Sequence, residues 1–300
     1  MAEDVATLGA TIPAGRTAWG ESTRWATARL LLRHRSFQTG LGLFAVLVLA
    51  AALVPMISGA DPTKLSMRTR FVPPGADFLF GTDNFGRSQL ARVVHGARLS
   101  LMIGTSVVVL NAIFGALLGS LSGYFHRLDN PLMRINDALM AFPPVLLAIA
   151  VTAVLGRSTP NVIVALAIVY VPRTARIVRA SVLVIRQMEF VQAAVAAGAG
   201  HWRILRRHIL PNAMAPLIVQ LSFLFGYAVL TEATLSFLGL GAEPPTPTWG
   251  NIMAEGRALW QVKPYIVFFP AAFLSVTVLA VNLLGDGLRD ALDPRMAKSL

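Results

Sequence analysis

Long runs of uncharged, apolar residues alternate along the chain with short segments that carry the Lys and Arg residues. A helix needs about 20 apolar residues to cross the roughly 30 Å hydrocarbon layer of a bilayer. The pattern therefore predicts an all-α integral membrane protein with six transmembrane helices. The predicted spans are residues 40–57, a stretch within 99–125, residues 138–155, a helix that starts at 158, and residues 215–236 and 265–284.

The fourth span has the shortest apolar run, because only residues 158–172 are free of charge. Its helical pattern continues through arginines that fall on one side of a helix at 100° per residue. We therefore expect the span to finish with a basic side that faces lipid headgroups or a partner. These arginines are Arg173, Arg176, Arg179 and Arg186.

The predicted outer connection, residues 58–98, begins with turn-forming residues that include Pro73-Pro74-Gly75. From Asn84 onward its pattern indicates an amphipathic helix, and Asp83 is the expected cap of that helix. The apolar side of the helix is formed by Leu90, Val93, Val94 and Ala97.

Basic residues are distributed unevenly between the two sides of this topology. With the N-terminus inside, 17 Lys and Arg residues fall on the cytoplasmic side and 9 on the outer side. The positive-inside rule then predicts that the tails at residues 1–39 and 286–300 are both cytoplasmic. The first apolar run is uncharged from 36 to 60, too long for the core of a signal peptide, and should remain as an anchor.

Composition supports a membrane protein and argues against other classes. Hydrophobic residues make up 55% of the chain and charged residues only 14%, whereas soluble domains carry about 25% charged residues. The net charge of +11 does not indicate nucleic-acid binding, because the basic residues lie between apolar runs and fit contacts with membrane lipid. The chain has no cysteine, no phosphate-binding Gly-x-x-x-x-Gly-Lys-Ser/Thr loop, no metal-ligand spacing among its histidines and no paired intramembrane carboxylates. We therefore expect neither an enzyme nor a cofactor site in this chain.

The connection between the fourth and fifth spans carries an unusual segment. Residues 192–197 are typical of a short helix with a surface of small side chains, which Gly198 and Gly200 interrupt. A second, basic and amphipathic helix follows at residues 202–209. We expect Pro211 to end it, and Pro216 fits the first turn of the fifth span. Such a helix pair at the membrane surface binds either lipid or a protein partner, and the spacing alone leaves both open.

The same segment resembles a motif of bacterial ABC-importer permeases. That motif reads Glu-Ala-Ala, three residues, Gly, nine residues, Ile, one residue and Leu-Pro. Here Gln192-Ala193-Ala194, Gly198 and Leu210-Pro211 stand at that spacing, with Gln192 in place of Glu and His208 in place of Ile. The Glu change removes any salt bridge that the acid would make.

Further blocks resemble the C-type subunit of the dipeptide/oligopeptide permease family, and together they cover about residues 80–294. They are FGTDNFGRSQLARVVHGARLSL at 80–101, RIND at 134–137 followed by Phe142-Pro143, RHILPN at 207–212, EATLSFLGLGAEPPTPTWG at 232–250 and NLLGDGLRDALDP at 282–294.

The resemblance implies a type I ABC-importer permease in the bacterial inner membrane. It implies a five-helix core at residues 99–285 that contains a cytoplasmic coupling segment at 187–212. The expected partners are a sister permease that completes a heterodimer, one or two ABC ATPase subunits that hold the ATP and magnesium, and an extracytoplasmic solute-binding protein. The residues expected to contact an ATPase are Gln192, Ala193, Ala194, Gly198, Trp202, Leu210 and Pro211.

Two alternatives to peptide import remain at this point. Permeases for nickel chelates and other solutes resemble this sequence, because the binding protein sets much of the cargo. A stand-alone secondary transporter belongs to a different class, which favours internal repeats and several intramembrane charges. The sequence has no visible repeat and one such charge, Glu232.

Glu232 lies at the outer end of the fifth span and has two interpretations. It is a gate or pathway residue, or it is a hydrogen-bonded cap for the turn at Gly239 and Gly241. The structural interpretation is favoured, because no second intramembrane charge is available as a partner. After the sixth span, Asp286, Arg289 and Asp290 have the spacing of a local ion pair on a helix.

Overall fold

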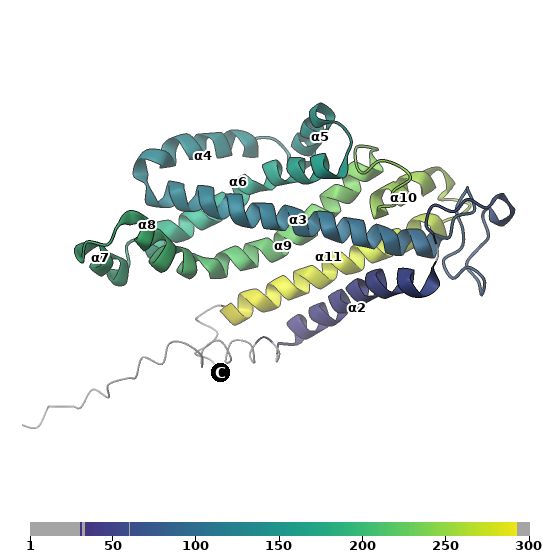
Figure 1. The fold of residues 1–300 in the computed structure, drawn as a ribbon, viewed down its shortest axis with the longest axis horizontal. Coiled ribbons are helices and arrows are strands. Elements are labelled where there is room, and N and C mark those ends of the chain that lie inside the picture. Colours follow the sequence, from purple (N-terminus) through teal and green to yellow (C-terminus); the bar gives the residue numbers. More distant parts are fainter. Residues whose placement is uncertain (1–30, 32–33, 60, 293–300) are drawn as a thin grey trace, which may run out of the picture.

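The computed structural model describes residue 31, residues 34–59 and residues 61–292, and this part of the chain is helical without β-strands. Long helices lie side by side, with α7 and α8 at one end of the bundle and α10 at the other (Figure 1). The α-helices are α2 Arg35–Ser58, α3 Gln89–Tyr124, α4 His126–Met140, α5 Pro144–Leu155, α6 Thr159–Ile185, α7 Glu189–Ala196, α8 His201–Ile204, α9 Leu210–Phe237, α10 Trp249–Gly256 and α11 Tyr265–Leu292. Short helical turns occur at η1 Met67–Thr69, η2 Leu205–Ile209 (a π-helix) and η3 Arg257–Leu259.

Helices α3 and α6 run in the same direction and touch closely. A side chain at Gly115 of α3 would meet Thr174 of α6 at 2.6 Å, and one at Gly123 would meet Val182 at 2.8 Å. Residue numbers increase in the same direction on both helices from the first contact to the second, so the two helices are parallel. The intervening α4 and α5 must therefore return the chain from one end of α3 to the opposite end.

The predicted third span, residues 138–155, is wrong as a single helix. Helix α4 ends at Met140, and α5 begins at Pro144 after a bend of 94°. Pro143 and Pro144 explain the break, because proline cannot donate the backbone hydrogen bond that would continue a helix. Five described helices are long and apolar enough to cross a membrane, and the bent pair makes six if it counts as one span.

The second span and the amphipathic outer helix form one helix, α3, of 36 residues. It begins at Gln89 and not at Asn84, and its cap is Ser88, whose hydroxyl accepts a hydrogen bond from the amide of Ala91. The prediction that Asp83 caps this helix is therefore wrong. Asp83 instead accepts hydrogen bonds from the Arg87 and Arg92 side chains and is 1% exposed.

These three charges belong to a network that Glu255 of α10 completes. Its carboxylate accepts hydrogen bonds from Arg87 at 2.6 Å and from Arg92 at 2.7 and 2.9 Å. Arg92 is 1% exposed, so its charge requires this pairing inside the protein. The network fixes the outer connection and α10 against the start of α3.

The fourth span is confirmed as a full-length helix, α6. Its basic side turns toward the protein's own helices at most positions. Arg176 pairs with Asp137 of α4, Arg179 forms two hydrogen bonds with Asp129 of α4, and Arg186 donates to the carbonyl of Gly123. Arg173 lies instead over the ring of Tyr227, with its guanidinium carbon 5.6 Å from the ring centroid.

Both ends of the described chain meet at the same end of the bundle. His34, just before α2, contacts Asp290 near the end of α11 at 3.1 Å. The expected local ion pair of Arg289 with Asp286 or Asp290 is absent from the described residues. Most of the predicted tail at residues 1–39 lies outside the described residues, as do residues 293–300.

Candidate coupling site

The segment after α6 forms the predicted helix pair. Helix α7 covers Glu189–Ala196, and Gly198 then adopts a φ of +78°, a left-handed conformation that L side chains rarely take. Helix α8 starts at His201. The prediction that the glycines interrupt the two helices is therefore confirmed.

Buried apolar side chains anchor this pair to the long helices. Val191 of α7, Ile204 of α8 and Leu205 and Ile209 of η2 are each at most 2% exposed. They pack in one cluster with residues of α6, namely Val178, Val182 and Ile185. Because one face of the pair is packed this tightly, a force applied to its other face passes to α6 and α9.

The opposite face carries most of the predicted contact residues. Gln192, Ala193 and Gly198 are exposed, and Ala194 is half-buried against the cluster. A side chain built at Gly198 would meet nothing within 4 Å in this chain. Gln192 donates a hydrogen bond of 3.1 Å to the carbonyl of Arg186, which ties α7 to the end of α6. The small surface is therefore open to a partner.

Trp202 adds a bulky, 62% exposed side chain to the same end of the molecule. It lines a cavity of about 370 Å³ whose other walls are Arg203, Arg206 and Arg207. This combination of an aromatic ring and cations suits either lipid headgroups or an acidic protein surface.

The junction with the fifth span differs from the prediction. Pro211 does not end the second helix, because α8, η2 and α9 follow one another without a gap and Pro211 lies in the first turn of α9. Pro216 is inside α9 and not in its first turn. Leu210 is half-buried and Pro211 is exposed, so both lie beside the helix pair at the foot of α9. The coupling segment and the fifth span are therefore one continuous piece.

Two aromatic contacts that the sequence reasoning missed also hold the pair. Tyr124 at the end of α3 lies 2.9 Å from the His201 ring nitrogen, and Phe190 of α7 lies 6.4 Å from the ring of His208. The helical spacing of His201 and His208 gave no signal for these partners, because Tyr124 comes from a distant helix and Phe190 from the preceding helix, α7. The described residues contain no cluster that could hold a metal ion.

Glu232 lies far from this pair, in α9 at the opposite end of the bundle, and it is 0% exposed. Its carboxylate accepts hydrogen bonds from Ser100 of α3 at 3.0 Å and from Ser236 of α9 at 2.7 Å. A side chain at Gly241 would meet Ser236 at 1.8 Å, so the following turn folds directly onto this group. The sequence could have indicated Ser236 as a partner of Glu232, because it lies four residues later on the same helix. It gave no signal for Ser100, which lies on another helix.

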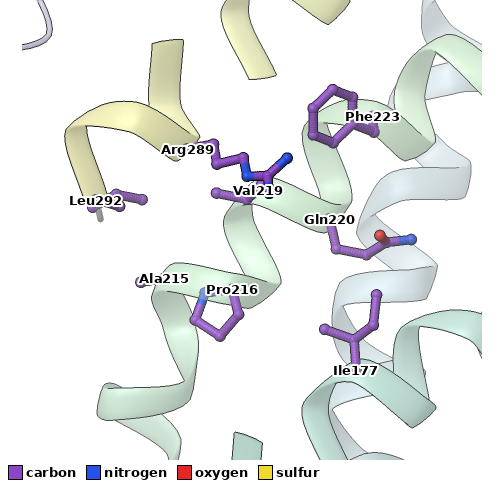
Figure 2. A pocket seen from close by; sticks show the side chains of 8 residues that line it. All are labelled: Ile177, Ala215, Pro216, Val219, Gln220, Phe223, Arg289 and Leu292. Carbon is purple, nitrogen blue, oxygen red and sulfur yellow. The ribbon is translucent and has the colours of Figure 1, made fainter. Parts of the chain in front are cut away.

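A second cavity lies between α6, α9 and α11, as Figure 2 shows. It has a volume of about 390 Å³, and Arg289 reaches across it from α11 toward α9 (Figure 2). Gln220 and Ile177 line its other side. No ion pair among the described residues includes Arg289.

The comparison with known proteins decides the family. A model of the family described as binding-protein-dependent transport system inner membrane component matches residues 90–298. The chain belongs to this family. It is therefore a multi-pass membrane permease component of an ABC transport system, which operates together with an ATPase and other subunits. The prediction of a type I ABC-importer permease is confirmed.

Several relatives of the chain carry names that describe transport. A Brucella abortus protein that bears the name of a peptide transport system permease is 53% identical over 277 residues, 92% of this chain and 94% of that protein. A dipeptide transport system permease protein of Alkalihalophilus pseudofirmus is 43% identical over 274 residues, 91% of this chain and 90% of that protein. A glutathione transport system permease protein of Pectobacterium atrosepticum is 42% identical over 287 residues, 94% of this chain and 92% of that protein.

Proposed function

We propose that this permease imports di- and oligopeptides, and that a sister permease completes the translocation pathway. The observation that supports a peptide cargo is 53% identity, over 92% of the chain, to a protein named for peptide transport. Another relative is named for transport of glutathione, which is itself a tripeptide, so this name is consistent with a short-peptide cargo.

The exposed face of α7 and α8 is the proposed contact with a cytoplasmic ATPase. Gln192, Ala193, Ala194 and Gly198 offer a small surface, and the apolar cluster beneath them transmits movement to α6 and α9. Trp202, Leu210 and Pro211 extend this surface toward the membrane. In this arrangement ATP and magnesium bind to the ATPase subunits, and a solute-binding protein delivers cargo from outside.

The proposed orientation places both termini, α7 and α8 in the cytoplasm. It rests on the excess of Lys and Arg in the cytoplasmic connections and on the meeting of His34 with Asp290 at one end of the bundle. The bacterial inner membrane is the proposed location.

The direct test is uptake of a labelled dipeptide by cells that lack this subunit. Uptake should be lost and then restored by the gene, and excess glutathione or a tripeptide should compete if the site accepts short peptides generally. Unchanged dipeptide uptake combined with loss of nickel-chelate uptake would overturn the peptide assignment. The purified subunit alone should hydrolyse no ATP, whereas the assembled importer should.

A further inference from the structure

Arg173 occupies an unusual place for a charged side chain. It lies near the middle of α6, about 21 Å from the start of the helix and about 18 Å from its end at 1.5 Å per residue. Tyr227 of α9, whose ring lies beside this guanidinium, is about 26 Å from the start of its own helix by the same rule. By helix length the guanidinium lies within the membrane-spanning part of both helices, away from their ends, and it is exposed in this subunit.

The other arginines on this side of α6 differ from Arg173 in their partners. Arg176 and Arg179 each bind an aspartate of α4, and Arg186 binds a backbone carbonyl. Within the part of the chain that the structure describes, no ion pair joins Arg173 to a carboxylate, and its guanidinium lies over the face of Tyr227. Its charge is available to a group outside this subunit.

The exposed guanidinium of Arg173 is unsuited to contact with lipid tails. Charged residues at membrane depth face a bundle interior or a water-filled cavity, because lipid tails do not solvate them. A cavity of about 170 Å³ lies beside Arg173, with walls from the bend between α4 and α5. The side chain thus lies between this cavity and Tyr227.

The neighbouring face of α9 mixes polar and apolar side chains. Residues three or four apart form a stripe along this helix, in which Asn212, Gln220, Tyr227 and Thr234 alternate with Pro216, Phe223 and Leu230. The inner part of the stripe borders the cavity of Figure 2, where Gln220 faces Ile177, one turn after Arg173 on α6. Arg289, also without an ion-pair partner among the described residues, lies on the far side of that cavity. Arg173 and Arg289 therefore each border a cavity along α6, the first beside the bend between α4 and α5 and the second beside α9.

We propose that these two cavities belong to the translocation pathway and that Arg173, supported by Tyr227, binds the carboxylate of the passing peptide. Arg289 receives the same carboxylate at the inner end. This inference rests on the proposed peptide cargo, because a free peptide carries a C-terminal carboxylate that guanidinium binds through two parallel hydrogen bonds. Two separate cationic positions allow the cargo to move on from each.

Uptake by the complete importer with Arg173→Gln and Arg173→Lys provides the first test. Each variant is reconstituted with its partner subunits, and uptake of a dipeptide is compared with uptake of its C-terminal amide at concentrations that saturate the binding protein. Arg173→Gln should reduce dipeptide uptake about tenfold or more and leave amide uptake unchanged. Arg173→Lys keeps the charge but not the two parallel hydrogen bonds, so its dipeptide uptake should lie between those of the wild type and Arg173→Gln. Arg176→Gln is the matched control, because that arginine already has an acid partner, and it should leave the ratio of the two uptake rates unchanged.

A second test uses the absence of cysteine from this chain. Arg173→Cys introduces a single thiol, which should react with water-soluble thiol reagents in the assembled importer and be protected by cargo. A cationic reagent should restore dipeptide uptake and an anionic one should not, with the cysteine-free subunit as the background.

Several results would overturn the inference while the proposed function stands. They are an unchanged ratio of dipeptide to amide uptake in Arg173→Gln, a thiol at 173 that does not react, and equal recovery with reagents of either charge. Loss of the sister subunit from purified Arg173→Gln would assign Arg173 to an ion pair between subunits instead. A wild-type importer that takes up no peptide would refute the proposed function itself.

Discussion

Pro55 and Arg98 show how two residues that are distant in sequence satisfy one backbone group. Proline has no amide hydrogen, so Pro55 leaves the carbonyl of Ala51 in α2 without its helical donor. Arg98 of α3 donates to that carbonyl at 2.6 Å and to the carbonyl of Ala52 at 2.9 Å. A neighbouring side chain thereby makes a proline tolerable inside a membrane helix.

This account predicts coupling between the two positions. Arg98→Met should lower the free energy of unfolding by about 1–3 kcal/mol, because the Ala51 carbonyl loses its donor. In a Pro55→Ala background the new amide replaces that donor, so Arg98→Met should cost about 1 kcal/mol less. Unfolding of the four variants in micelles titrated with a denaturing detergent measures the difference. Equal costs in both backgrounds would show that Arg98 does not act through Pro55.

At the scale of elements, local patterns predicted most helices, and long-range contacts account for the errors. The apolar run and the arginines of α6 were sufficient to predict a full-length helix. The start of α3 was misplaced because Asp83 has the residue type of a cap, while it in fact binds Arg87 and Arg92. Arg92 is held in turn by Glu255, more than 160 residues away. The helix pair α7 and α8 was predictable because its glycines act locally, whereas the contact of Tyr124 with His201 joins segments that no local pattern connects.

The outer network gives a graded prediction for stability. Asp83→Asn should lower the free energy of unfolding by about 3–5 kcal/mol, because it leaves the buried Arg92 with too little negative charge. Glu255→Gln should cost less, because the Glu255 side chain is 31% exposed and Asp83 still pairs with both arginines. Thermal unfolding of the purified subunit compares the two variants. A larger loss for Glu255→Gln would place the centre of the network at α10 instead.

At the scale of the whole molecule, the question is whether α4 and α5 together cross the membrane. Parallel packing of α3 and α6 requires the chain to return between them, which favours six crossings. Composition alone could not decide this, because α5 has only 12 residues and α4 is polar.

Reporter fusions decide the number of crossings. A reporter placed after Lys298 should be cytoplasmic, and one placed within residues 73–76 should be outside. Five crossings would put both reporters on the same side of the membrane, a result that would contradict the six-span topology.

The central claim, that α7 and α8 couple peptide import to a separate ATPase, is tested most directly at Gly198. Gly198→Trp introduces strain at a φ of +78° and a bulky group on the partner face, although the same position is open within this subunit. Gly239→Trp is the matched control, because Gly239 has a φ of +79°, equally open space and a place at the opposite end of the bundle. The measurement is ATPase co-purification together with ATP-driven dipeptide uptake in proteoliposomes. We predict that Gly198→Trp loses both by about tenfold or more at normal membrane levels, as a penalty above 1.4 kcal/mol requires, and that Gly239→Trp keeps the ATPase bound. Normal co-purification and full uptake with Gly198→Trp would contradict the claim.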